Sequence, residues 1–400
     1  MCILRVSVIA ALAAAGIAFG FAAGDGTANN PYQISTPDHL EAVNDDLSAH
    51  YVLTNNIDLS GRTYDSAVIA PDTDSSNTGF DGTQFSGSFD GAGYKILNLT
   101  IDSSVYFLGL FSGIIDGGEI RNLGVEDAAI TACDDAEYVG GLCGGNRGTI
   151  TNCYATGSVS GGDNSHYLGG LCGINLEGTI ENCYATGSVS GGDDSRYLGG
   201  LCGWNEGTIE NCYAAGDVSG KDNSIVLGGL CGMNKGTITN CYAAGDVSGG
   251  DNSRGLGGLF GGNEEGAITN CYATGKVKAG NKAEYLGGLC GGNEEGAITN
   301  CYATGSVSGG NDSEGLGGLC GENQEGTITN CFWDKETSGM EESDGGTGLT
   351  AAQMKTQSTF TNAGWDFADS SAANEEDGIW LMDEKNYPKL NVIVEIDHKN

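Results

Sequence analysis

Short apolar runs recur through the middle of the chain at intervals of about 30 residues. Each unit contains Leu-Gly-Gly-Leu-Cys, then Thr-Ile-Thr-Asn-Cys-Tyr-Ala, then Ser-Val-Ser, with Gly or Asn between the runs. Such runs are typical of short β-strands. Helical hairpin repeats are excluded because Gly and β-branched residues fill the units and no apolar stripe at helical spacing is present. The pattern predicts an all-β fold, a β-solenoid with about three short strands per turn.

Two columns of cysteine set the register of this repeat. The first position holds Cys143, Cys172, Cys202, Cys231, Cys290 and Cys320, with Phe260 in the remaining unit. The second position holds Cys153, Cys183, Cys212, Cys241, Cys271, Cys301 and Cys331. The step from second to next first position is always 19 residues, whereas the step from first to second is 10 or 11. The extra residue always falls between Asn and Gly, so we expect an exposed corner at Asn-x-Gly.

Weaker copies extend the repeat towards the N-terminus. Phe111 and Leu123 match the two cysteine positions, and we assign Phe89 and Leu99 to the same positions one coil earlier. An isoleucine column runs through Ile96, Ile120, Ile150, Ile180, Ile209, Ile238, Ile268, Ile298 and Ile328. These copies predict about nine coils. Leucine at a cysteine position indicates that the position is apolar and faces inward.

A bend is expected at the asparagine that precedes each second cysteine. The three-residue step from Ile150 to Cys153 breaks strand alternation, so both side chains face inward only if the chain bends between them. Asn tolerates the left-handed conformation that such a bend needs. The residues concerned are Asn152, Asn182, Asn211, Asn240, Asn270, Asn300 and Asn330. Their stacked amides can hydrogen-bond to one another along the column.

Both ends of a solenoid need caps, because open strand edges pair with other chains. A short helix with Thr36 as its N-cap is expected over 37–47, and a second over 350–357. Trp365, Trp380 and Tyr387 are expected to cover the last coil.

The first residues read as an export signal. Residues 1–23 carry one charge, Arg5, followed by an apolar run that ends in small residues. This order is typical of a cleaved signal peptide. An uncleaved membrane anchor is the alternative, since the run is near spanning length. We therefore expect the mature chain to be extracellular or at the cell surface.

The repeat also carries a family resemblance. The segment GGLCGGNRGTITNCYATGSVSGG resembles the GLUG motif of secreted and surface proteins of bacteria and archaea. The leader NPYQISTPDHLEAVN and the tail GTGLTAAQMKTQSTFTNAGWDF resemble the usual flanks, so the resemblance covers nearly all of residues 26–390. It implies a right-handed parallel β-helix at the cell surface, and it does not imply a catalytic activity. Some members carry a zinc-protease domain, but His-Glu-x-x-His does not occur in this sequence.

This interpretation divides the chain into four parts. They are a signal peptide (1–23), an N-terminal cap with the first strands (24–84), GLUG-type β-solenoid repeats (85–333) and a C-terminal cap (334–400).

Composition narrows the range of possible protein classes and partners. The 400 residues include 70 Gly and 4 Pro without a Gly-X-Y period, which excludes collagen. The formal net charge of -36 makes nucleic acid and anionic membranes poor partners, because like charges repel.

The cysteines allow two interpretations. They are either apolar core ladders, as Phe and Leu at equivalent positions suggest, or disulfides, which export favours. Parallel side-chain vectors on stacked strands fit a disulfide poorly. Bonds between molecules are most plausible at Cys133, Cys320 or Cys331. A metal site is poorly supported, because the sequence contains no Cys-x-x-Cys and its four histidines are scattered.

Two further columns are candidates for binding. Acidic residues recur at one corner: Asp163, Asp193, Asp194, Asp222, Asp251 and Asp312. Calcium would relieve the repulsion of stacked carboxylates, whereas a solvated face needs no ion. Tyrosines follow the second cysteine and are expected to point outward: Tyr154, Tyr184, Tyr213, Tyr242, Tyr272 and Tyr302. Such a stripe either stacks on sugars or a second copy, or stabilises the sheet.

Three functions remain in competition. A polysaccharide lyase or hydrolase needs different residues converging at one place, whereas this chain repeats the same residues on every coil. A surface adhesin or carbohydrate-binding rod would use the tyrosine stripe. A self-assembling structural protein of an extracellular layer or sheath fits the cysteine content and the repetitive faces, and is similar in composition and export to the cysteine-rich sheath proteins of some archaea. The sequence favours the structural function without a cofactor, with further copies of the chain as the main partner.

Overall fold

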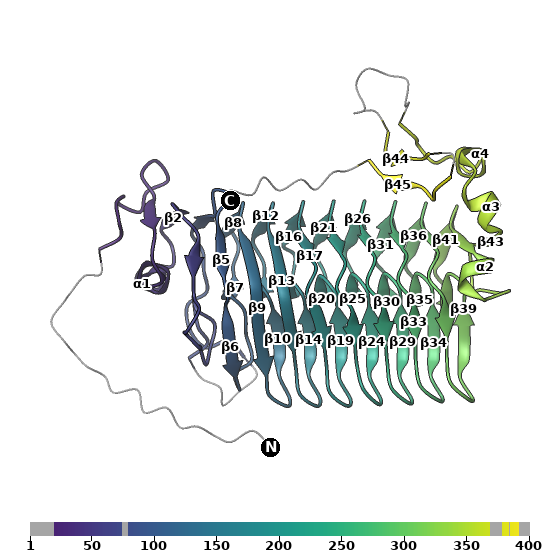
Figure 1. Ribbon diagram of the computed structural model, residues 1–400, viewed down its shortest axis with the longest axis horizontal. Coiled ribbons are helices and arrows are strands. Elements are labelled where there is room, and N and C mark those ends of the chain that lie inside the picture. Colours follow the sequence, from purple (N-terminus) through teal and green to yellow (C-terminus); the bar gives the residue numbers. More distant parts are fainter. Residues whose placement is uncertain (1–19, 74–78, 369–377, 384, 392–400) are drawn as a thin grey trace.

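The computed structural model describes residues 20–73, 79–368, 378–383 and 385–391. Its coils stack along one axis into an elongated body, with small helical elements at both ends (Figure 1). The strands of successive coils pair in parallel and in register, as Cys172 with Cys202 and Ile180 with Ile209. The predicted all-β, parallel β-solenoid is therefore confirmed. It has about eight turns rather than nine, since one of its long sheets contains eight strands.

Four sheets, here numbered S1 to S4 in the order in which one coil visits them, form the walls. S1 contains β10 (Glu137–Gly140), β14 (His166–Gly169), β19 (Arg196–Gly199), β24 (Ile225–Gly228), β29 (Arg254–Gly257), β34 (Glu284–Gly287) and β39 (Glu314–Gly317). S2 contains β7 (Phe111–Ile114), β11 (Cys143–Asn146), β15 (Cys172–Asn175), β20 (Cys202–Asn205), β25 (Cys231–Asn234), β30 (Phe260–Glu264), β35 (Cys290–Glu294) and β40 (Cys320–Gln324).

The other two walls reach further towards the ends. S3 contains β1 (Tyr32–Ile34), β2 (His50–Leu53), β4 (Ser88–Asp90), β8 (Glu119–Arg121), β12 (Thr149–Thr151), β16 (Thr179–Glu181), β21 (Thr208–Glu210), β26 (Thr237–Thr239), β31 (Ala267–Thr269), β36 (Ala297–Thr299) and β41 (Thr327–Thr329). S4 contains β3 (Ile57–Asp58), β5 (Lys95–Leu97), β6 (Thr100–Ser103), β9 (Gly124–Ala132), β13 (Tyr154–Ser160), β17 (Tyr184–Ala185), β18 (Ser188–Ser190), β22 (Tyr213–Ala214), β23 (Val218–Ser219), β27 (Tyr242–Ala243), β28 (Val247–Ser248), β32 (Tyr272–Ala273), β33 (Val277–Lys278), β37 (Tyr302–Ala303), β38 (Val307–Ser308), β42 (Phe332–Asp334) and β43 (Thr347–Leu349).

A typical coil contains five short strands, so the expectation of three was too low. The run Leu-Gly-Gly-Leu-Cys is divided between β14 and β15 by a bend at Gly170. A Cβ on Gly170 would lie 2.2 Å from the Gly200 carbonyl oxygen, so the bend needs glycine. The second division was predicted: Asn182 has φ 52°, and it separates β16 from β17.

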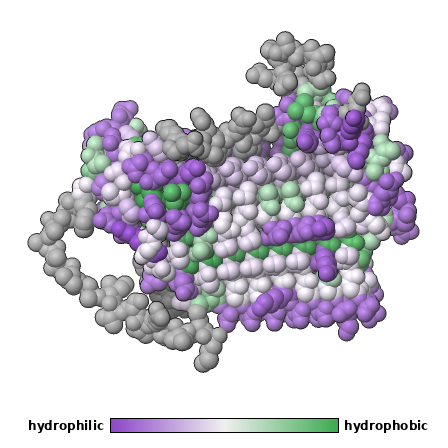
Figure 2. All heavy atoms as spheres, in the orientation of Figure 1, coloured by the Kyte–Doolittle hydropathy of each residue, from purple (hydrophilic) through white to green (hydrophobic). Residues whose placement is uncertain are grey.

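The interior is filled by columns of identical apolar side chains. Leu168, Leu171, Cys172, Ile180 and their equivalents in neighbouring coils are fully buried. Because equivalent residues stack, the surface is also striped: Figure 2 shows rows of similar hydropathy parallel to the long axis, with a hydrophilic row along one edge.

Three upstream assignments were wrong. Phe89 pairs with Ile120 and so occupies the isoleucine column, and Ile69 rather than Phe89 bridges to Phe111. Ile96 pairs with Val125 in S4, so it does not belong to the isoleucine column. Leu99 also lies outside the second cysteine column, because its neighbour Thr100 pairs with Ala129. The first coils depart from the repeat, which explains why their register could not be fixed by counting.

The N-terminal cap includes α1 (Pro37–Glu41) and the 3-10 helix η1 (Ala42–Asp45). The Thr36 side chain accepts a hydrogen bond from the His39 N–H, as predicted for an N-cap. Phe21 stacks on Tyr32 with ring centroids 4.3 Å apart, so the end of the predicted signal peptide contacts this cap. Residues 1–19 lie outside the described residues, and the signal peptide stays a prediction. Within the described ranges, no helix has the length and apolar character needed to cross a bilayer.

The C-terminal cap combines short helices with aromatic side chains. It contains α2 (Lys335–Ser338), α3 (Ala351–Met354), α4 (Gln357–Thr361) and the antiparallel pair β44 (Trp380–Leu381) and β45 (Lys389–Leu390). Thr350 and Gln353 form a capping box at the start of α3. Trp365 and Trp380 are buried against Tyr302 and Phe332 of the last coils, and Tyr387 packs beside them. The predicted aromatic cover is therefore present.

Candidate functional site

The predicted tyrosine stripe is a continuous stack, but it is exposed only in its middle. Ring centroids from Tyr154 to Tyr302 follow each other at 4.8 to 5.0 Å with nearly parallel planes. Contrary to the expectation of an outward column, Tyr154 and Tyr302 are buried. The Tyr154 hydroxyl donates to Glu126, and the C-terminal cap covers Tyr302. The tyrosines that a ligand or partner could contact are the half-buried ones: Tyr184, Tyr213, Tyr242 and Tyr272.

Because of this stack, we expect the folded protein to lose stability at alkaline pH. Burial raises the pKa of Tyr242 from 10.0 to about 12 and also raises the pKa of Tyr213. Since the folded pKa exceeds the unfolded pKa, the stabilisation is fully present below pH 10 and is lost as the pH rises through about 12. We expect the midpoint of unfolding to fall over this pH interval. A spectrophotometric titration of the phenolate follows the ionisation of the tyrosines over the same interval. Tyr242→Phe should show a smaller fall, and an equal fall in both proteins would contradict the assignment.

The predicted asparagine ladder is present from Asn211 to Asn330 and is interrupted at Asn182. Asn152 Nδ2 donates to Asn122 Oδ1 at 3.1 Å, and four further bonds of 3.2 to 3.5 Å link members from Asn211 to Asn330. Asn182 differs, because its amide donates to Glu181. All seven predicted members have positive φ, so the residue is selected by the bend as well as by the amide.

A second asparagine ladder was missed. Its members lie at the Asn-x-Gly corner: Asn146, Asn175, Asn205, Asn234, Asn263, Asn293 and Asn323. Each Nδ2 except that of Asn323, the last member, donates to the Oδ1 of the next coil at 2.7 or 2.8 Å. The expectation of an exposed corner was therefore wrong for Asn175, which is fully buried, and right for the inserted Glu177, which is exposed. The Asn that recurs before the variable insert was the signal that could have identified this ladder.

The described cysteines of both columns are buried and carry free thiols. Their sulfurs are used within the fold: Cys183 Sγ donates to the Glu181 carbonyl at 3.1 Å, and the Cys183 N–H donates to Cys212 Sγ at 3.4 Å. Burial raises the pKa of the Cys212 and Cys231 thiols, which keeps them protonated. The geometry is that of core ladders.

We expect the thirteen column thiols to be unreactive in the native protein, because reagents attack exposed thiolates. Mass spectrometry after alkylation should find none of them labelled in the native state and all of them labelled in denaturant. The control is the same reaction after prior reduction, which should give the same native result. Disulfides within either column in unreduced material would contradict this prediction.

Cys133 lies outside both columns, directly after β9, and the link between molecules expected at this residue stays a prediction. Cys320 and Cys331, the other two residues considered for such a link, are buried. Across the described residues, no three His, Cys, Asp or Glu side chains are grouped so that they could hold a metal ion.

The acidic corner has a structural explanation. Asp163 Oδ1 accepts the Asp193 N–H at 2.9 Å, and Asp222 and Asp251 accept equivalent N–H groups from the following coils. These hydrogen bonds lower the pKa of Asp251. The carboxylates thus accept hydrogen bonds from the backbone N–H groups of the turn, and this role needs no calcium. Asp194 and Asp312 lie beside this ladder with positive φ and exposed side chains.

A second aromatic column on S1 was also missed. Phe107, Tyr138, Tyr167 and Tyr197 stack with centroids 4.5 to 5.2 Å apart, and Tyr285 continues the column after a gap. The four tyrosines have φ between 58° and 60°, a conformation unfavourable for a large side chain. Their recurrence five residues before the first cysteine column could have revealed them.

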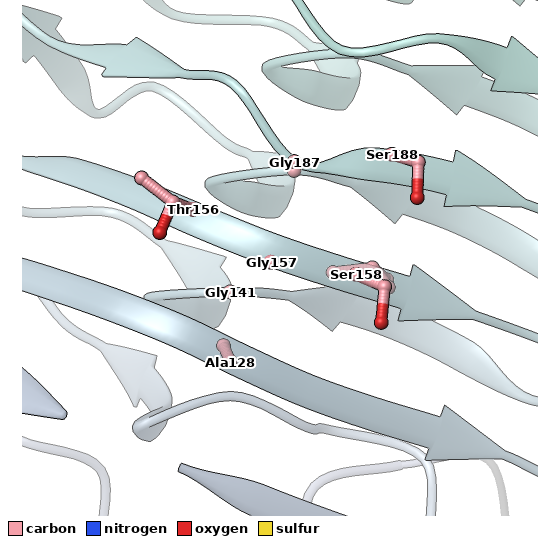
Figure 3. A pocket seen from close by; sticks show the side chains of 9 residues that line it. Ala128, Gly141, Thr156, Gly157, Ser158, Gly187 and Ser188 are labelled. Atoms are coloured by element: carbon pink, nitrogen blue, oxygen red, sulfur yellow. The ribbon is translucent and has the colours of Figure 1, made fainter. Parts of the chain in front are cut away.

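Two cavities accompany these columns. One, lined by residues such as Gly157, Ser158 and Ser188 on adjacent strands (Figure 3), measures about 10 Å³ and has room for no more than a water molecule. The other is a groove of about 230 Å³ on S1 and S2 beside Gly255 and Tyr285. The groove is large enough to receive a ligand.

Comparison with known proteins identifies the repeat. The family model described as the GLUG motif matches residues 135–160, 164–190, 194–219, 252–278 and 282–308. The chain thus contains five repeats of the GLUG motif. A segment of 149 residues is 34% identical to part of halomucin of Haloquadratum walsbyi. The match covers 34% of this chain and 2% of halomucin. A Gly-rich membrane protein of Evansella cellulosilytica is 35% identical over 33% of this chain and 15% of its own length. The chain therefore spans a small part of these relatives.

The solved structures extend the likeness to the fold. A structure from Bacteroides ovatus, described as an immunoglobulin A1 protease, superposes on this chain with a TM-score of 0.51. The match covers 92% of this chain and 95% of the other, at 19% identity. At this identity the likeness concerns the fold alone.

Proposed function

We propose that this GLUG protein is a non-catalytic structural rod of the cell surface or the extracellular space, and that it associates with further copies of itself. The observation that carries the proposal is the repetition of the same side chains in columns from coil to coil. Catalysis needs different groups converging at one place, whereas these columns offer the same groups in many places. The names of halomucin and the Gly-rich membrane protein support a surface location.

The half-buried tyrosines of S4 are the surface that we assign to self-association. Tyr184, Tyr213 and Tyr242 form a flat aromatic strip about three coils long, and aromatic residues are enriched at protein interfaces. A second copy could lay its own strip against this one.

Sedimentation velocity over a range of concentrations tests the proposal. We expect larger species at higher concentration, and weaker assembly for the double variant Tyr213→Ser/Tyr242→Ser. The matched control is Tyr167→Ser/Tyr197→Ser, which removes two stacked tyrosines from the other column. A protein that stays monomeric throughout would refute self-association, and cleavage of polysaccharide or immunoglobulin substrates would refute the non-catalytic role.

A glycan-binding surface rod is the second candidate function. The groove on S1 and S2 favours it, because the regular surface is hollowed there to the size of a small ligand.

A further inference from the structure

The groove arises from one coil that lacks two surface side chains. Two neighbouring columns, one on S1 and one on S2, usually carry a large residue in at least one position of each coil: Tyr197 with Trp204, and Val226 with Met233. In the next coil both positions are glycine, Gly255 and Gly262. Among the described coils, this is the one with glycine at both positions.

The same coil carries the exception inside the body. Phe260 replaces the cysteine of the first column and is fully buried. Its ring fills the interior at the level where the surface is hollowed. This coil thus has a large side chain in the interior and none at these two surface positions. The coil that contains Trp204 has the opposite arrangement.

The walls of the groove differ in chemistry. Val226 and Met233 form an apolar wall on one side, and Tyr285 forms an aromatic wall on the other. The Arg254 guanidinium lies 4.7 Å from the centre of the Tyr285 ring, so the rim carries hydrogen-bond donors beside an aromatic face. Glu264, Glu294, Glu322 and Gln324 supply acceptors around the opening.

Charge and size restrict the occupant. Three carboxylates and one guanidinium line the groove, on a chain whose net charge is -36, so an anionic ligand is repelled. A volume of about 230 Å³ is below the range of pockets for drug-sized molecules, which begins near 300 Å³. An aromatic wall, apolar contacts and several donors and acceptors suit a compact molecule with one apolar face and many hydroxyl groups.

We propose that this groove binds one neutral pyranose residue of a glycan chain. The apolar face of the sugar ring packs on Tyr285, while its hydroxyl groups bond to Arg254 and to the carboxylates of the rim. Uronic acid residues are excluded by the carboxylates.

The repeat supplies a variant that closes the groove without disturbing the fold. Gly255→Tyr restores the residue found at this position in four other coils, where tyrosine has the same positive φ; Gly255 itself has φ 71°. An added Cβ would meet nothing closer than 3.6 Å. The matched control is Gly145→Trp, which adds a large side chain to the Trp204 column away from the groove; its nearest contact is 3.6 Å.

The test is isothermal titration calorimetry with neutral oligosaccharides (cello-, xylo- and manno-oligosaccharides) and with oligogalacturonate. We expect at least one neutral series to bind and oligogalacturonate not to bind. Gly255→Tyr and Tyr285→Ala should each weaken binding by about tenfold, since the first variant fills the groove and the second removes its aromatic wall. Gly145→Trp and Tyr285→Phe should remain within about twofold of the parent.

Three results would overturn the proposal: no binding of any neutral series at millimolar concentration, binding unaffected by Gly255→Tyr, or equal binding of oligogalacturonate. A fourth is that Gly255→Tyr abolishes self-association while sugar binding is absent, which would assign the groove to a second copy. Circular dichroism of each variant establishes that the solenoid is intact. Because sedimentation is measured separately, the structural proposal can fail while sugar binding stands, and the reverse.

Discussion

Gly228→Ala should destabilise the solenoid by at least about 3 kcal/mol. Gly228 ends β24 at the sharp bend between S1 and S2, where the chain of the next coil passes very close. An added Cβ would lie 2.0 Å from the Cys231 carbonyl oxygen and 2.6 Å from the Phe260 Cα. These are backbone atoms held by hydrogen bonds on both sides, so no side chain can rotate away to make room. The coil must open or its neighbours must separate.

The matched control is Gly292→Ala in an adjacent part of S2. A Cβ on Gly292 meets nothing within 4 Å, so we expect a change within about 0.5 kcal/mol. Thermal unfolding followed by circular dichroism measures both variants, and hydrogen exchange locates the loss at the coils around residue 228. Equal midpoints for the two variants would show that the bend is not as tight as the structure indicates.

Asn234→Ala should cost about 3 kcal/mol or more, because it leaves several buried polar groups without partners. Asn234 Nδ2 donates to Asn263 Oδ1, and its Oδ1 accepts from Asn205 Nδ2, both at 2.8 Å. The same side chain closes the corner by bonding to the carbonyl and the N–H of Gly236. Water cannot replace these bonds, since Asn234 is fully buried.

Asn240→Gly provides the comparison within the same coil. Asn240 belongs to the half-buried ladder, where water can take the place of the amide, and glycine keeps the positive φ of 53°. We expect a loss of about 1 kcal/mol or less in a urea titration. If Asn240→Gly proved as costly as Asn234→Ala, burial would not be the reason for the importance of the inner ladder.

The sequence predicted the architecture well, because identical residues stack at fixed intervals. The inward direction of Cys153 and Ile150 and the left-handed bend at Asn152 followed from a three-residue step that strand alternation alone cannot explain. The upstream coils could not be assigned in this way. Their spacing is irregular, so Phe89 was placed in a cysteine column although it belongs with the isoleucines.

The surface was harder to predict than the core. Outward direction was inferred for Tyr302 from its neighbour Cys301, but the distant C-terminal cap buries it, and no local pattern carries that information. Asn175 was placed outside because length variation is typical of surface turns; the insertion is accommodated at Glu177 while the preceding amide stays inside. The groove depends on the absence of side chains at Gly255 and Gly262, which becomes visible only once the two columns are known to be adjacent.

The parallel pairing of successive coils also determines how the rod responds to force. The backbone hydrogen bonds between coils point along the long axis, so tension applied to the two ends loads every interface between coils in series. Each interface resists with all of its bonds at once, and the first to break is the weakest. Stretching should therefore release the chain one coil at a time, dissipating work at each step while the remaining coils keep their shape.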